Sequence, residues 1–225
     1  MGRVSKVDKK DILYFEGLED LLIAVMQTPD GIEQAPTYKD VIRLPIGTKL
    51  GVKGNGTSLE KWASSKMFRR VSRETKHDLA LSHVGMPIAL MDELKGLVAE
   101  SGVTFGKNTA TEHPYLAFGF IGNIENGGKK AVWYPKAQLS NVIDEEYTTE
   151  DDSALKIDDI TANFSAVGLN YNQVMYASFD SNRDGAKDFD KFIAQPVYDK
   201  NQWAELIKKQ PPVPNEPTGG NFINV

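Results

Sequence analysis

The sequence contains no cysteine. This absence excludes disulfide bonds, thiol catalysis and metal sites built on sulfur, and it fits folding in a reducing cytoplasm. Long apolar runs are missing too, since the longest, Leu21–Met26, is far too short to span a bilayer. Residues 1–15 lack the apolar run of a signal peptide, and Lys6 stands where myristoylation needs serine or threonine. We expect a soluble protein that folds inside a cell.

Motifs for catalysis and nucleotide binding are also missing. The three histidines, His77, His83 and His113, do not have the spacing of a zinc site. The glycine-rich stretch GVKGNGTS lacks the Gly-Lys-Ser/Thr that would hold phosphate and magnesium. There is no G-x-S-x-G elbow and no closely spaced carboxylate pair in an apolar setting. We therefore expect no enzymatic activity and no cofactor.

The composition is that of an ordinary globular protein of 225 residues, with 40% hydrophobic and 25% charged side chains. A formal net charge of −5 argues against tight nonspecific binding of nucleic acid by the chain as a whole. It leaves open a protein that has to avoid sticking to DNA.

Alternating hydrophobicity predicts a protein made mainly of strands. The clearest pair, residues 114–122 and 129–139, is joined by Asn126-Gly127-Gly128 and predicts a β-hairpin. In its second strand we expect one face to carry Ala131, Trp133, Ala137 and Leu139. Further strands are expected over residues 44–56, 72–84, 154–169 and 174–180, with a face switch and β-bulge at Asp158–Asp159. Residues 17–27 have helical periodicity but end in a turn signal, so a buried strand is equally compatible.

Two helices are expected. One begins near Pro87 and ends at Gly96, and the other follows Asp199 as its N-cap and ends before Pro211. The proline- and glycine-rich tail Pro211–Val225 has too little apolar material for a core and predicts an extended arm.

The stretch Asp180–Asp190, DSNRDGAKDFD, resembles the first half of an EF-hand loop. Its twelfth position, however, is Lys191 instead of the bidentate glutamate that such a loop needs, and the stretch follows a strand. A turn in which Gly185 takes positive φ is the favoured interpretation. The remaining, weaker candidates for a metal site are Asp180, Asn182, Asp184 and Asp188.

Charge is distributed unevenly along the chain. Residues 61–76 are strongly basic, whereas residues 144–152 carry six carboxylates and no base. Such charge runs are most often solvent-exposed segments with no binding role. The more specific alternative is that the two runs are complementary surfaces of a self-assembling protein. The interface candidates on this second interpretation are Lys66, Arg69, Arg70, Arg73, Glu145, Glu146, Glu150, Asp151 and Asp152.

Residues 115–168, YLAFGFIGNIENGGKKAVWYPKAQLSNVIDEEYTTEDDSALKIDDITANFSAVG, resemble the major tail proteins of long-tailed bacteriophages, the phi13-type and related tube proteins. The matching pattern is an apolar strand, a glycine-rich turn with lysines, an aromatic strand, a charged linker and a long strand rich in Ile, Thr and Phe. A looser match extends back to Leu18 and implies that residues 18–27 form a strand. Beyond Gly168 the sequence departs from the family pattern.

The resemblance implies two packed antiparallel sheets, as a sandwich or partial barrel, with a flanking helix at about 87–96 and a long loop at about 54–75. It divides the chain into an N-terminal arm (1–17), a tube domain (18–198) and a C-terminal helix with an extended arm (199–225). The implied function is a virion subunit whose hexameric rings stack into a conduit for double-stranded DNA, assembled in the host cytoplasm. The implied partners are other copies of the chain and the tape measure, tail terminator and distal tail or baseplate proteins. No membrane partner is implied. The alternatives are a distal or terminator ring protein or, with less support, a calcium-binding β-sandwich module.

Overall fold

The computed structural model describes residues 14–106, 112–140 and 159–208, which are mainly β-strand. Within these ranges the strands are β1 (Phe15–Thr28), β2 (Thr37–Tyr38), β3 (Ile42–Leu44), β4 (Gly47–Ala63), β5 (Lys66–His83), β6 (Leu116–Ile124), β7 (Gly128–Leu139), β8 (Ile160–Val167) and β9 (Ala177–Asp180). The helices are α1 (Ile88–Leu94), α2 (Phe189–Ala194) and α3 (Lys200–Lys208). None of the described helices is long and apolar enough to cross a membrane.

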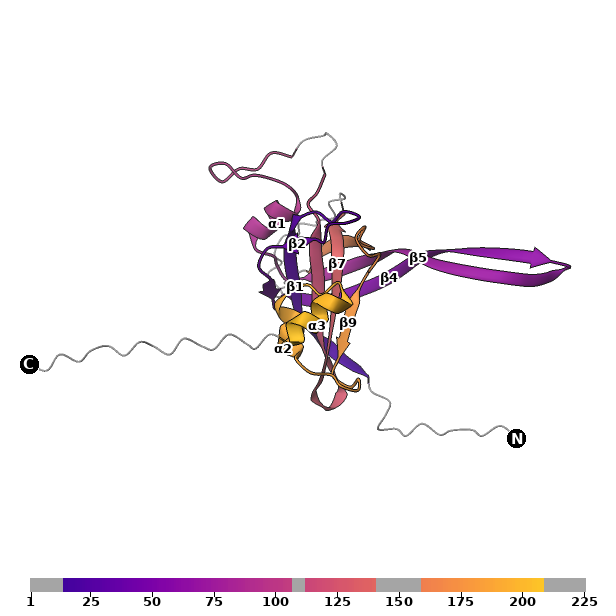
Figure 1. Ribbon diagram of the computed structural model, residues 1–225. Coiled ribbons are helices and arrows are strands. Elements are labelled where there is room, and N and C mark those ends of the chain that lie inside the picture. The colour runs from indigo at the N-terminus through magenta and orange to yellow at the C-terminus, as the bar shows by residue number, and fades with distance from the viewer. Residues whose placement is uncertain (1–13, 107–111, 141–158, 209–225) are drawn as a thin grey trace, which may run out of the picture.

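All nine strands belong to one antiparallel sheet, in the order β2-β1-β6-β7-β8-β5-β4, with β3 added to β1 and β9 to β7. After a two-residue turn, β3 leads directly into β4, which is the opposite end of that order. The sheet therefore curls until its two ends approach each other (Figure 1). The strand pairing gives one continuous sheet and does not confirm the predicted division into two sheets.

The concave side of the curled sheet encloses the larger hydrophobic core, which we call the inner core. Its buried members are Leu21, Ile23, Val25, Leu44, Leu79, Leu81, Leu90, Leu94, Leu116, Phe118, Val132, Tyr134, Ala137, Leu139, Ala162, Phe164 and Ala166. Strand β8 faces this core with Ala162, Phe164 and Ala166, whereas Ile160 is 42% exposed. Helix α1, predicted over 87–96, is shorter and supplies Leu90 and Leu94 to this core.

The strand interpretation of residues 18–27 is confirmed by β1. Helical periodicity is misleading here because both faces of the strand are covered. Leu21 and Ile23 point into the inner core, and Leu22 and Ala24 join a second cluster on the convex side, here called the outer core. A strand buried on both faces carries a continuous apolar run, which resembles a buried helix in sequence.

The predicted hairpin is β6–β7, with Asn126 and Gly127 both at positive φ in its turn. The expectation of one face for Ala131, Trp133, Ala137 and Leu139 is wrong, because the first two lie in the outer core and the last two in the inner core. The pairing register shifts between Leu116 and Phe118, so β7 carries an extra residue beside Pro135. Proline has no N–H for the ladder, and a β-bulge is where a sheet tolerates it.

Helices α2 and α3 cover the outer core. Trp133 is fully buried there and its indole Nε1 donates a hydrogen bond to the carbonyl of Phe192, at 2.8 Å. Gly119 is required beside this indole, since a Cβ at that position would lie 2.7 Å from the ring. Helix α3 starts as predicted, with Asp199 Oδ1 accepting from the backbone N–H groups of Asn201 and Gln202. Helix α2 was not expected from the sequence.

Several predicted boundaries differ from the structure. The loop expected at about 54–75 is part of the long β4–β5 hairpin. Strand β1 begins at Phe15, inside the expected N-terminal arm, and α3 packs on the outer core instead of separating from the body at residue 199. The tail Pro211–Val225 lies wholly outside the described residues. The bulge expected at Asp158–Asp159 lies partly outside them, since only Asp159 is described.

A buried ion pair fixes the β7 bulge. Lys136 Nζ lies 2.6 Å from Asp30 Oδ1, with the two side chains 7% and 1% exposed, and it stands 4.7 Å from the centre of the Tyr115 ring. The other carboxylate oxygen of Asp30 accepts from the backbone N–H of Asn170. The pair therefore ties the chain after β1 and the turn after β8 to one point of β7.

Lys136→Met leaves the Asp30 carboxylate buried without its counter-charge, so we expect it to lower the free energy of unfolding by about 3–5 kcal/mol. Adding Asp30→Leu removes the stranded charge and should recover part of the loss. Urea denaturation of the two variants and the wild type measures both effects. A single variant as stable as the wild type would contradict this role.

His83 is buried at the end of β5, with 1% of its surface exposed, and neither ring nitrogen has a hydrogen-bond partner among the described residues. Burial lowers the pKa of the imidazole, and the charge of Asp159 opposes that shift only partly. Because the pKa in the folded state lies below that of the unfolded chain, protonation favours unfolding. The stabilising contribution is complete above the unfolded pKa and is lost as the pH falls through the folded pKa.

We expect His83→Leu to weaken the acid sensitivity of folding. Between about pH 7.5 and 5.5 the wild type should lose stability faster than the variant, by at most about 1.4 kcal/mol per pH unit. Urea unfolding of both proteins at both pH values measures this difference. The carboxylates are the same in the two proteins, so their titration cancels and the difference reports His83 alone. Parallel pH profiles for the two proteins would show that His83 does not titrate with unfolding.

Candidate assembly surface

The part of the β4–β5 hairpin beyond the sheet projects from the body as a two-stranded ribbon (Figure 1). We call residues 56–74 the arm. Strand β5 pairs with β8 only from Lys76 to His83, so in the described part of the chain the arm strands pair only with each other. The β4 half of the arm runs from Gly56 to Ala63, which makes the arm about 25 Å long at the usual rise of a strand. Both outer edges of the arm present backbone groups without a partner strand in the described chain.

The tip of the arm is a tight turn made by Ser64 and Ser65, whose φ values are 50° and 59°. Positive φ at both central residues gives a turn whose twist matches that of the flanking strands. The serines are not the asparagine-glycine pair that usually signals such a turn, which is why the sequence suggests a loop here.

The basic residues predicted as interface candidates, Lys66, Arg69, Arg70 and Arg73, all lie exposed on the arm. Arg70 has a partial partner in Glu60, at 3.4 Å between exposed side chains. Arg69 instead lies directly opposite Lys61 in the strand register, and like charges in that position repel. The arm thus carries positive charge that its own strands do not neutralise.

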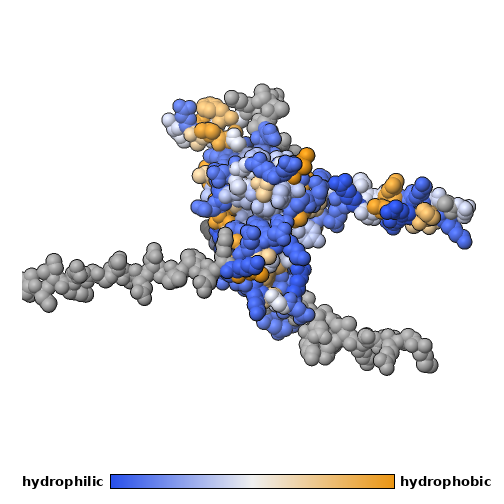
Figure 2. Space-filling model, in the orientation of Figure 1, coloured by the Kyte–Doolittle hydropathy of each residue, from blue (hydrophilic) through white to orange (hydrophobic). Residues whose placement is uncertain are grey.

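Large apolar side chains are exposed on the same arm, which the sequence analysis did not single out. Leu59 is 72% exposed and Phe68 74% exposed, although both sit in strands. In the register Leu59 pairs with Val71, and Trp62, also 60% exposed, pairs with Met67. Figure 2 shows hydrophobic patches among the charged residues of the projecting arm. Apolar and basic residues are interspersed along 57–73 without a regular period of two, so the sequence carries no clear strand signal there.

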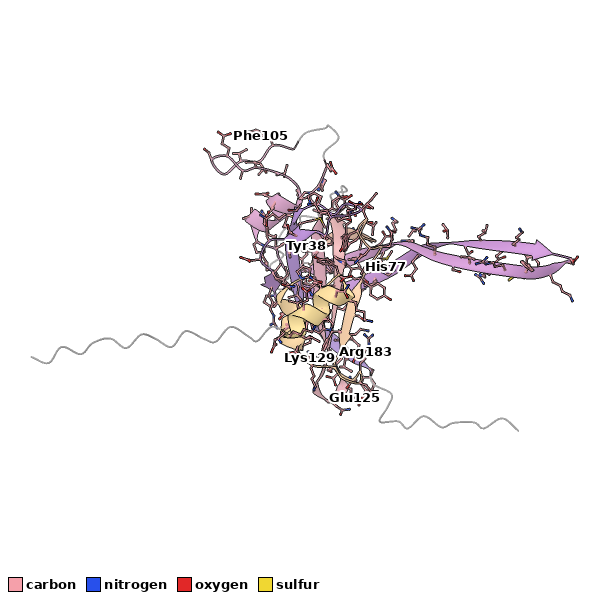
Figure 3. All side chains as sticks on the ribbon, viewed as in Figure 1. Tyr38, His77, Phe105, Glu125, Lys129 and Arg183 are labelled. Atoms are coloured by element: carbon pink, nitrogen blue, oxygen red, sulfur yellow. The ribbon has the colours of Figure 1, made fainter. Side chains whose placement is uncertain are left out.

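The base of the arm, by contrast, is held firmly. His77 is buried where the arm meets the body (Figure 3), with its ring stacked on Tyr176 at 5.8 Å between centroids and edge-on to Tyr134. On the facing strand, a Cβ at Gly56 would lie 2.8 Å from the carbonyl oxygen of Arg73. The hairpin is therefore anchored at its base, where the packing is close, and is exposed to solvent beyond it.

The acidic run expected to face this basic surface lies outside the described residues. It includes Glu145, Glu146, Glu150, Asp151 and Asp152, so their contacts stay predictions.

The stretch Asp180–Asp190 is a turn followed by the start of α2, as the favoured interpretation predicted. Asp180 Oδ1 accepts from the backbone N–H of Asn182, and Gly185 has a φ of 74°. Lys191 Nζ lies 3.1 Å from Asp188 Oδ1 and fills the place where a calcium loop would need a carboxylate. In the ranges that the structure describes, no three acidic, histidine or cysteine side chains gather as a metal site would need, Asp184 included.

No family model and no curated protein sequence matches this chain.

Proposed function

We propose that the chain is a structural subunit that assembles with copies of itself through the β4–β5 arm, and that the assembly is the tail tube of a long-tailed bacteriophage. One observation carries the first part. Every side chain described from residue 56 to 74 is exposed, including Leu59, Trp62 and Phe68.

An isolated two-stranded hairpin is at best marginally stable in water, and open edges with apolar side chains invite pairing with other chains. A neighbouring copy that covers the arm would bury its apolar side chains and place its positive charges beside carboxylates. Exposed ion pairs contribute only about 0.2–1 kcal/mol each. In a repeating assembly such weak pairs are multiplied, and they set register and salt dependence more than strength.

The tail-tube assignment rests on the sequence resemblance of residues 18–168 and is compatible with the curled sheet. In the proposed fold the two halves of that sheet act as the layers of a sandwich or partial barrel flanked by a helix. Six copies would form a ring, and stacked rings would form the conduit for double-stranded DNA. An acidic net charge of −5 suits a channel that must not bind phosphates. Tape measure, terminator and distal tail or baseplate proteins would be the partners, and the virion tail the location.

Electron microscopy of the purified protein tests the proposal. We expect six-fold rings or tubes for the wild type. The matched variant replaces residues 56–75 with Asn-Gly, which joins the paired residues Asn55 and Lys76 by a short hairpin turn. It should keep the wild-type melting temperature within a few degrees but stay monomeric, because the arm adds nothing to either core.

Three outcomes would contradict the proposal. The wild type could stay monomeric at high concentration, or the shortened variant could assemble as well as the wild type. If the protein shifted duplex DNA in a gel and the shift required the arm, the arm would instead be a nucleic-acid-binding ribbon. Rings that never stack would favour the distal or terminator alternative, and a calcium-dependent rise in melting temperature would favour the calcium-binding module.

A further inference from the structure

A second exposed apolar surface surrounds α1 and the segment that follows it. Ile88 is 80% exposed, Val98 85% and Phe105 69%. Glu100 and Val103 form an isolated antiparallel bridge, which closes a small turn over residues 100–103 within this segment. Figure 3 labels Phe105 at the outer part of this segment, well away from the arm. We call residues 88–106 together with Glu112 the α1 surface.

The charge of the α1 surface is opposite to that of the arm. Its carboxylates are Asp92, Glu93, Glu100 and Glu112, against a single base, Lys95. Glu93 is paired with Lys39 at 2.5 Å, while Glu100 and Glu112 are exposed. The arm has an excess of basic residues around exposed Leu59, Trp62 and Phe68. The two surfaces thus match in both charge and hydrophobicity.

An apolar groove at the base of β4 is the competing acceptor. It is lined by Phe15, Leu18, Thr48, Lys49, Leu50, Val52, Phe120 and Lys130. The two lysines in its lining give the groove the same sign of charge as the arm, and like charges brought together disfavour docking. The α1 surface is therefore the better match.

We propose that the arm of one copy docks on the α1 surface of a second copy; this rests on the proposed function and specifies its contact. The arm and the α1 surface project from different sides of the body (Figure 1), so one molecule presents them to two different neighbours. The contact is heterologous, since each copy offers its arm to one neighbour and its α1 surface to another. Such contacts close into a ring when the rotation allows it and otherwise continue as a filament.

Cross-linking in the full chain tests the contact directly, because the chain has no cysteine of its own. The variant Lys66→Cys/Thr104→Cys places one thiol near the arm tip and one on the α1 surface. With a flexible bis-maleimide we expect a ladder of covalent trimers and larger species, because a repeating head-to-tail contact joins the arm thiol of each copy to the α1-surface thiol of the next. The matched control, Lys66→Cys/Lys49→Cys, places the second thiol in the groove and should give no ladder.

Charge reversal supplies an independent readout. Arg69→Glu/Arg70→Glu/Arg73→Glu and Asp92→Lys/Glu100→Lys/Glu112→Lys should each raise the concentration for half-assembly about tenfold, which is about 1.4 kcal/mol. The variant that combines all six substitutions should assemble at a concentration close to that of the wild type. The reversal Asp184→Lys/Asp190→Lys/Glu205→Lys makes the same charge change on residues outside the α1 surface and should not compensate for the arm variant.

The outcomes separate the two proposals. If the wild type assembles but the ladder forms with the groove pair and not with the α1-surface pair, the α1 surface is not the acceptor and the proposed function stands. The same conclusion follows if the combined charge variant recovers nothing. If the wild type does not assemble at all, the contact and the proposed function both fail.

Discussion

The exposed arm is the constraint on which the functional account depends. Within the hairpin of β4 and β5, the half near His83 pairs with β8 and buries Leu79 and Leu81, whereas the half near Lys66 pairs, in the described chain, with its partner strand alone. Open strand edges can pair with another chain, and apolar side chains clustered on a surface are typical of a site that a partner covers. In the proposed assembly, the arm is the element of one chain that a second chain covers.

The body supports the arm because its two cores share the same strands. Strand β1 faces the inner core with Ile23 and the outer core with Leu22, and β7 does the same on either side of its bulge. The buried pair of Lys136 and Asp30 holds that bulge, and the aromatic contacts of His77 hold the base of the hairpin. A firmly held base fixes the point at which the ribbon leaves the body.

The sequence predicted the strands with clear turns or clear alternation, such as the β6–β7 hairpin with Asn126-Gly127 and the strand β8. It failed where a local pattern depended on distant partners. The face switch in β7 follows from a bulge at Pro135 that alternation alone cannot locate. The arm resembles a loop in sequence because exposed charges hide strand periodicity. Helix α2 was missed because it is short and is preceded by Asp188, which has a left-handed conformation. The sequence singled out the basic residues that lie exposed on the arm, but not the exposed apolar residues beside them, such as Trp62.

Hydrogen exchange measured residue by residue tests the central claim most directly. In a dilute monomer the amides of residues 56–74 should exchange nearly as fast as free peptide, because a lone hairpin opens at almost no cost, while Leu21–Met26 stay protected. On assembly the arm amides should become strongly protected, and those of β1 should change little. Arm amides that are already protected in the monomer, or that remain unprotected in the assembly, would contradict the account.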